Sequence, residues 1–200
     1  MSNFVWTSEA TRMEPNKKPY ISPEKYLEIE RAAEYKSEYF NGEMFALAGA
    51  KRNHNLIALN TGSELRMQLK GRPCQVYPSD MRVKVPETGL YTYPDVVVVC
   101  GEPQFEDKVT DTLLNPVVII EVLSESTEGY DRGKKFEHYR HIPSLQEYVL
   151  ISQDRCKIEK FLKQKEWTLF EESSLESAME LPSIQCSLKL SEVYDKVVFE

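Results

Sequence analysis

The clearest hydrophobic pattern in the chain is a pair of apolar runs, mostly of β-branched residues. The first run, YPDVVVVC, begins at Tyr93, and the second, NPVVIIEVLSEST, begins at Asn115. Both runs are nearly continuous rather than alternating, which predicts central strands covered on both faces. Each run carries one acid, Asp95 at the start of the first and Glu121 near the end of the second. A carboxylate in such surroundings is costly unless something compensates its charge.

The segments before these runs predict an arm, two helices and a hairpin. Residues 1–20 are polar with scattered prolines and predict an extended arm. SPEKYLEIERAAE predicts a helix, because Ser22 is a favoured N-cap and a proline follows it. KSEYFNGEMFALAG predicts a hairpin with Asn41-Gly42 as its turn. The next segment predicts a helix that stops at Gly71, with an apolar face formed by Leu56, Leu59, Leu65 and Leu69.

The remaining segments add strands and short helices. CQVYP and MRVKVP predict two strands before the first apolar run. SESTEGYDRGKKFEHYRHI predicts a loop and a short helix that ends before Pro143. EYVLIS, CKIEKFLKQ and EWTLFEE predict a meander of strands, and SLKLSEVYDKVVF a closing helical segment with some strand character. Because no repeat or linker divides the chain, we expect one mixed α/β domain over residues 21–200, with a central mixed sheet flanked by helices.

Charge and cysteine usage narrow the class of protein. The net charge of −7 argues against nonspecific coating of nucleic acid, but basic residues gather in short segments that could form a local face. No apolar run approaches the roughly 20 residues that span a bilayer, and the chain does not begin like a secretory signal. The cysteines are widely spaced without a CxxC pair, which favours reduced thiols in a cytoplasmic protein over disulfides or zinc. They are Cys74, Cys100, Cys156 and Cys186.

The two buried acids are the first candidates for chemistry. If their strands are neighbours, Asp95 and Glu121 can point into one cleft, where repulsion between like charges would raise one pKa. A bound divalent cation would remove that conflict, and Mg²⁺ prefers hard carboxylate oxygens. The alternative interpretation is that each acid caps a strand or pairs with an arginine.

The helix expected after Glu121 supplies candidate basic groups. Asp131 is a plausible N-cap, Lys135 and Tyr139 lie four residues apart on one face, and Lys134 pairs with His138 in the same way. A lysine beside a phosphate can neutralise developing charge or help position the attacking water. The alternative is a solvated basic helix face.

The order and spacing of these motifs resemble a known family. The motifs are Pro94-Asp95, Glu121-Val122-Leu123-Ser124, Asp131 with Lys135 and Tyr139, and EYVLI, with NGEMFALAG, His54 and PSDMRV upstream. Together they resemble the Uma-two family of the PD-(D/E)XK, or restriction-endonuclease-like, superfamily. The resemblance runs from Pro23 to Ser152 and more loosely to the end of the chain. It implies a restriction-endonuclease-like core in which a mixed sheet is flanked by helices.

The resemblance also implies a reaction and the residues that perform it. Mg²⁺ or Mn²⁺ would be held by Asp95 and Glu121, with the backbone carbonyl of Val122, for metal-assisted hydrolysis of phosphodiester bonds. The general superfamily pattern places a lysine two residues after the second acid, where this chain has Leu123. In this family the lysine comes instead from the next helix, which maps onto Lys135, with Lys134 as the alternative. The implied partner is nucleic acid, with DNA as the first candidate.

Three further candidates keep two interpretations each. Glu43 could complete the metal environment from the hairpin or be an ordinary exposed acid. His54 could contact substrate or a carboxylate, or make only a structural polar contact. Tyr130 and Tyr139 could stack on a base or belong to the core. The rival function is a nuclease-fold module that binds nucleic acid or a protein without cutting, and a homodimer that exchanges the N-terminal arm would suit either function.

Overall fold

The computed structural model describes residues 19–199, so the arm predicted over residues 1–20 lies almost wholly outside the described part. The first helix, α1 (Pro23–Ala32), begins as predicted, because the Lys25 N–H donates to Ser22 Oγ at 3.3 Å. Strands β1 (Ser37–Phe40) and β2 (Glu43–Ala46) form the predicted hairpin. Its turn residues Asn41 and Gly42 have φ angles of 49° and 85°, a conformation that favours the Asn-Gly pair.

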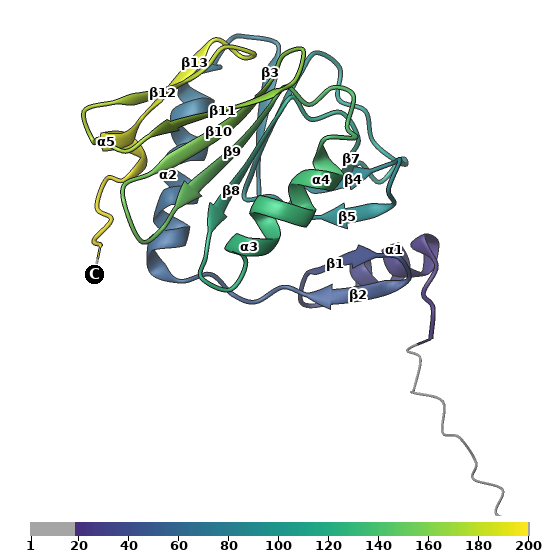
Figure 1. Cartoon of the computed structure of the whole chain (residues 1–200). Coiled ribbons are helices and arrows are strands. Elements are labelled where there is room, and N and C mark those ends of the chain that lie inside the picture. Colours follow the sequence, from purple (N-terminus) through teal and green to yellow (C-terminus); the bar gives the residue numbers. More distant parts are fainter. Residues whose placement is uncertain (1–18, 200) are drawn as a thin grey trace, which may run out of the picture.

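The strands form three sheets (Figure 1). The order in the largest is β11 (Trp167–Glu172), β10 (Ile158–Lys163), β9 (Glu147–Ser152), β8 (Val118–Leu123), β6 (Val96–Cys100) and β3 (Cys74–Pro78). The second runs β2, β1, β5 (Leu90–Thr92), β4 (Arg82–Val85) and β7 (Thr112–Leu113). The third pairs β12 (Ala178–Leu181) with β13 (Cys186–Lys189). Strand β8 pairs parallel with β9 and antiparallel with β6, so the predicted mixed sheet is confirmed; β5, β7 and β12 were not predicted.

Helices cover both faces of the six-stranded sheet (Figure 1). One core lies between the sheet and α2 (Arg52–Gln68), with β12, β13 and α5 (Leu190–Val193) completing that side. The other core lies beneath a continuous helical segment made of α3 (Glu128–Tyr130), η1 (Asp131–Lys135) and α4 (Phe136–Tyr139). Alternate residues of each central strand point into opposite cores, as Val96 and Val97 do. The burial on both faces that the continuous apolar runs predict is therefore confirmed. No helix within residues 19–199 is long and apolar enough to cross a membrane.

The buried stripe of α2 differs from the predicted one. Leu59 is 66 % exposed, whereas Ile57, Thr61, Leu65 and Leu69 are buried. These four residues follow one another at intervals of four, which places them on one side of a helix. The prediction that Leu59 belongs to the core face was wrong, because the helix packs against the sheet along the Ile57 side.

The prediction of four reduced cysteines was also wrong. Cys74 and Cys100 form a disulfide, while Cys156 and Cys186 are free thiols. The bond joins β3 to β6, whose antiparallel register sets Cys74 directly opposite Cys100. The two residues are 26 apart in sequence, so only the strand pairing brings their side chains together.

An ion-pair network fixes α1 to the rest of the molecule and predicts a pH-dependent contribution to stability. Arg31 donates two hydrogen bonds to the Asp111 carboxylate, at 2.8 and 2.9 Å, and Arg82 Nη2 lies 2.9 Å from the same group. The hydrogen bonds from Arg31 hold the pKa of Asp111 well below its usual range. Asp111→Asn should therefore lower the free energy of unfolding by about 1–3 kcal/mol at pH 7.

That effect has a defined pH window. The depressed pKa of Asp111 means that its contribution is present above the unfolded value of about 3.9 and is lost as the pH falls below it. Urea unfolding at pH 7 and pH 3 should show a large difference between parent and variant at pH 7 and a smaller one at pH 3. Asp80→Asn is the matched control, since Asp80 is 87 % exposed in its pair with Lys36. An effect of Asp111→Asn that does not change with pH would contradict the prediction.

Candidate active site

The strand register brings the two predicted acids together. Strands β6 and β8 pair antiparallel, with Val96 opposite Ile120. Continuing that register by one residue sets Asp95, which directly precedes β6, opposite Glu121. Glu121 lies on the strand face of Ile119, on the side covered by the helix that follows β8, and Asp95 contacts the Val122 N–H and His54 of α2. The expectation that Asp95 and Glu121 lie on neighbouring strands is therefore confirmed.

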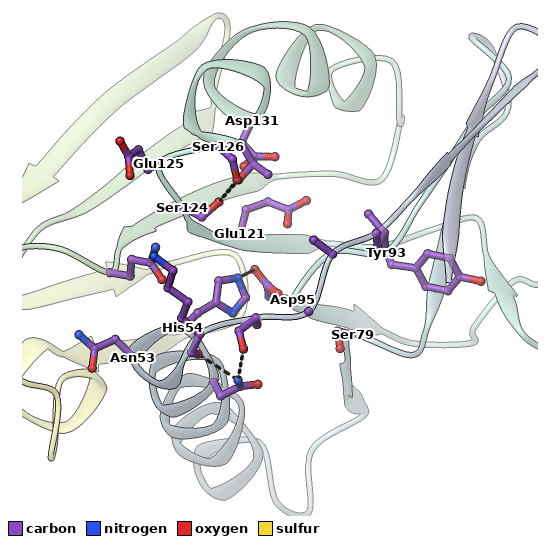
Figure 2. A pocket seen from close by; sticks show the side chains of 18 of the residues that line it. Asn53, His54, Ser79, Tyr93, Asp95, Glu121, Ser124, Glu125, Ser126 and Asp131 are labelled. Atoms are coloured by element: carbon purple, nitrogen blue, oxygen red, sulfur yellow. Dashed lines mark hydrogen bonds and ion pairs between the residues drawn. The ribbon is translucent and has the colours of Figure 1, made fainter. Parts of the chain in front are cut away.

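Both acids open into a cleft of about 1270 Å³ (Figure 2). Its charged wall is formed by residues from five separate parts of the chain. They are Glu38 of β1, His54 of α2, Asp95 before β6, Glu121 of β8, and Asp131 and Lys135 of η1. Figure 2 shows His54, Asp95, Glu121 and Asp131 around the same space, while the ring of Tyr93 points away from it.

Lys135 is the centre of the buried charges. Its ammonium Nζ lies 3.0 Å from Glu121 Oε1, 3.1 Å from Glu38 Oε1 and 3.3 Å from Asp131 Oδ1. All four side chains are less than 10 % exposed. Burial by itself would lower the pKa of Lys135, but the three carboxylates outweigh burial and raise that pKa well above its ordinary value. The three carboxylates therefore favour the charged form of Lys135.

Neutral hydroxyl groups hold these carboxylates in place. The Tyr139 hydroxyl donates to Glu121 Oε1 at 2.8 Å, and the Thr92 hydroxyl donates to Glu38 Oε1 at 2.5 Å. Tyr139 is fully buried, so the prediction that it could stack on a base was wrong. Its hydroxyl instead positions the carboxylate of Glu121 for contact with Lys135. The other tyrosine proposed for stacking, Tyr130, is 37 % exposed, with its ring centroid 5.9 Å from Lys135 Nζ.

Asp131 lies within the helical segment, so the prediction that it is an N-cap was wrong. The segment begins three residues earlier, at Glu128, and Asp131 itself has helical backbone angles. Its position opens a π-helical turn, Asp131–Lys135, a rare geometry that occurs frequently at functional sites. Asp131 is buried and directs its carboxylate towards Lys135. The structure therefore adds Asp131 to the acids of the site.

Asp95 is held by groups other than Lys135. Its Oδ2 accepts a hydrogen bond from the Val122 N–H at 2.7 Å and lies 3.3 Å from His54 Nε2. Burial alone would lower the pKa of His54, but the hydrogen bond and the charge of Asp95 outweigh burial and raise it. Of the two contacts expected for His54, the structure shows the one with a carboxylate.

The buried acids repel one another strongly. Burial raises the pKa of Glu121 to about 8; Lys135 opposes this shift, and Asp131, Asp95 and Glu38 add to it. Burial likewise raises the pKa of Asp131, against the attraction of Lys135. Six carboxylates line the cleft, against four lysine or arginine side chains and one histidine. The cleft has a deficit of positive charge.

The deficit of positive charge bears on whether this cleft can bind a divalent cation. No group of three or more His, Cys, Asp or Glu side chains within residues 19–199 is arranged to hold a metal ion. The donors are nevertheless hard oxygens in a space where acids outnumber basic side chains. By donor chemistry and charge, the paired carboxylates of Asp95 and Glu121 fit a divalent cation such as Mg²⁺.

The hairpin contributes a different acid from the one predicted. Glu43 is exposed on β2, one strand further from the cleft than β1, whereas Glu38 on β1 is buried against Lys135. Glu38 is not recognisable as a site residue from the sequence, because one acid in the short segment KSEYF gives no sign of burial. Of the two candidate lysines, the structure brings Lys135 into the site and leaves Lys134 exposed.

Comparisons with known proteins identify the family and the fold. The mixed sheet flanked by helices and its structural match place the fold in the restriction-endonuclease-like class. Residues 23–191 match the model of the Uma2 family, described as "Putative restriction endonuclease". The chain belongs to this Uma-two family.

Two relatives and one solved structure are similar to the chain. The Synechocystis uncharacterized protein sll1609 is 40 % identical over 153 residues, 76 % of this chain and 86 % of that protein. The Synechocystis uncharacterized protein slr1290 is 36 % identical over 183 residues, 90 % of this chain and 95 % of that protein. A crystal structure of a "putative nuclease" from Anabaena variabilis matches with a TM-score of 0.71 and 19 % identity, over 88 % of this chain and 98 % of that one. The last likeness shows a shared fold.

Proposed function

We propose that this protein is a metal-dependent endonuclease that hydrolyses phosphodiester bonds in nucleic acid, with DNA as the first substrate to test. The observation that carries the proposal is the pairing of Asp95 with Glu121 across two central strands, with Lys135 at 3.0 Å from Glu121. Membership of the Uma2 family supports it. A structural ion pair would need one acid for one lysine, whereas Lys135 Nζ lies within 3.3 Å of three acids, Glu38, Glu121 and Asp131.

Each residue of the site would have a separate role in the proposed reaction. Asp95 and Glu121 would hold Mg²⁺ or Mn²⁺, with Glu38 and Asp131 keeping Lys135 charged and in position. When bound, the divalent cation supplies charge neutralisation and Lewis-acid polarisation of the phosphate. Lys135 would donate a hydrogen bond to the phosphate or to the attacking water and stabilise the charge that develops in the transition state. Tyr139 would fix the orientation of Glu121 through its hydroxyl.

The first test is cleavage of supercoiled plasmid. The purified parent protein should nick the plasmid in Mg²⁺ or Mn²⁺ and not in EDTA, and Asp95→Asn should abolish that activity because one metal-binding oxygen is lost. Asp195→Asn is the matched control: Asp195 is 58 % exposed and pairs with Lys196. Equal nicking by parent and Asp95→Asn would assign the activity to a contaminant and contradict the proposal.

A binding module is the second candidate function. The observation that favours it is that no group of three or more metal-binding side chains is arranged for a metal ion in the described part of the chain. A module of this kind would retain nucleic acid without cutting it in any metal. Isothermal titration calorimetry of the protein with Mn²⁺ distinguishes the nuclease from the binding module. Mn²⁺ binding by the parent that disappears in Asp95→Asn favours the nuclease.

A further inference from the structure

The hairpin presents an exposed aromatic residue, Phe45, on the side that faces the cleft. Glu38 pairs directly with Phe45 in the β1–β2 ladder, so their side chains lie on the same face. The Leu47 N–H donates to the Lys36 carbonyl at 2.9 Å, which extends the pairing by one step. Lys36, Glu38 and Leu47 all line the cleft. Phe45 is not itself among the residues that line the cleft, but it shares a hairpin face with three residues that are, Lys36, Glu38 and Leu47.

The packing of the hairpin leaves Phe45 available. On the same face, Phe40 packs against His138 with 4.7 Å between ring centroids. On the opposite face, Tyr39 stacks on Tyr26 at 4.9 Å and is buried. Phe45, in contrast, is 48 % exposed. The hairpin is therefore anchored by other aromatic residues, and the exposed ring of Phe45 is free to contact a ligand.

The charge of the cleft limits what can bind there. Its lining carries six acids and only four lysines or arginines. The acids are Glu38, Asp95, Glu121, Glu125, Asp131 and Asp154, and the basic residues are Lys36, Lys51, Arg52 and Lys135. Proteins that hold duplex nucleic acid obtain most of their affinity from contacts between lysine or arginine and phosphates. This lining offers little such affinity, so a nucleic acid needs another source of binding energy.

The depth of the site also favours a single strand over a duplex. Glu121 is 4 % exposed and Lys135 is 6 % exposed, at the floor of the cleft. A phosphodiester must enter the cleft to reach them, which a flexible single strand does more readily than a stiff duplex. A single strand also exposes the faces of its bases, and base stacking on aromatic side chains supplies affinity without regard to sequence.

We propose that Phe45 stacks on an unpaired base and that the substrate of this site is a single-stranded segment of nucleic acid. Cleavage of this single strand rests on the proposed nuclease function, whereas its binding does not. Lys36 contacts the adjacent phosphate, Phe45 holds the base, and the next phosphodiester reaches Glu121 and Lys135. A free single strand and an unpaired tail of a duplex share this chemistry.

The test is binding of a fluorescein-labelled oligothymidine by the full chain, followed by fluorescence anisotropy in Ca²⁺. A labelled duplex of the same length and a duplex with a thymidine tail form the other arms. Phe45→Ala should raise the Kd for the single strand and the tail by about tenfold, the loss expected for one base–aromatic stack. Phe45→Trp should keep the affinity. Phe170→Ala is the matched control, since Phe170 is 42 % exposed on the edge strand β11.

The outcomes separate this inference from the proposed function. Equal single-strand affinity of parent and Phe45→Ala would overturn the inference, as would an equal loss for single strand and duplex. Nicking of duplex plasmid that Phe45→Ala leaves unchanged would overturn the inference while the nuclease proposal stands. Single-strand binding that depends on Phe45, without cleavage in Mn²⁺, would support the inference and count against the nuclease.

Discussion

Lys135→Met should lower the free energy of unfolding by about 3–5 kcal/mol, the range measured when one partner of a buried ion pair is removed. The lysine is the cation that lies within 3.3 Å of Glu38, Glu121 and Asp131. Without it, those buried carboxylates must either remain charged against one another or take up protons, and both alternatives cost free energy. Urea unfolding at pH 7 measures the effect.

Two further variants separate charge compensation from a general loss of packing. Lys134→Met changes the neighbouring exposed lysine and should alter stability by no more than about 0.5 kcal/mol. The double variant Lys135→Met with Glu121→Gln should recover part of the lost stability, because it removes one of the uncompensated acids. If Lys135→Met unfolds at the same urea concentration as the parent, Lys135 does not compensate the buried acids.

Glu121→Gln should leave the fold intact and lower the rate of the proposed metal-dependent cleavage by about 10²–10³-fold, a loss comparable to that of one electrostatic contact to the transition state. The reason is that one of the two carboxylates that would hold the cation is removed. The substitution keeps the shape of the side chain, so the amide oxygen can still accept from Tyr139. Because Glu121 is buried with other acids, its neutralisation should not reduce stability at pH 7. Single-turnover cleavage and thermal unfolding measure the two effects on the same preparation.

The control for this variant is an acid outside the cleft. Glu87→Gln changes a side chain that is 66 % exposed and pairs with His141, and it should cleave like the parent. Cleavage by Glu121→Gln at the parent rate would exclude Glu121 from the reaction. A large fall in its thermal stability would instead show that the carboxylate has a structural function.

Local sequence patterns predicted a large part of this fold. The turn at Asn41-Gly42 was recognisable because few residue pairs accept two positive φ angles. The runs around Asp95 and Glu121 were recognisable because strands covered on both faces must be apolar at successive positions. The position of Asp131 inside the helical segment was not recognisable. Residue types that favour N-caps also occur inside helices when their side chains find a buried partner. Here that partner is Lys135.

Contacts between distant segments could not be predicted in the same way. Leu59 has the same local signal as Leu65, yet only the rotation of α2 on the sheet decides which of them is buried. Cys74 and Cys100 meet because β3 pairs with β6. Glu38 enters the site because the hairpin's sheet carries β1 alongside the helix that holds Lys135. None of these contacts leaves a periodic trace in the sequence.

The sequence by itself determined which strands are central, which two acids interrupt them and which helix carries the lysine, because burial and turn geometry act over a few neighbouring residues. It also determined the likeness to the Uma-two family, which the family model confirms. Only the tertiary structure decided that Glu38 and Asp131 join Glu121 around Lys135, and that Phe45 lies on the same hairpin face as Glu38. The physical reason is that a cluster of charges depends on distances between segments, and strand register and helix packing fix those distances.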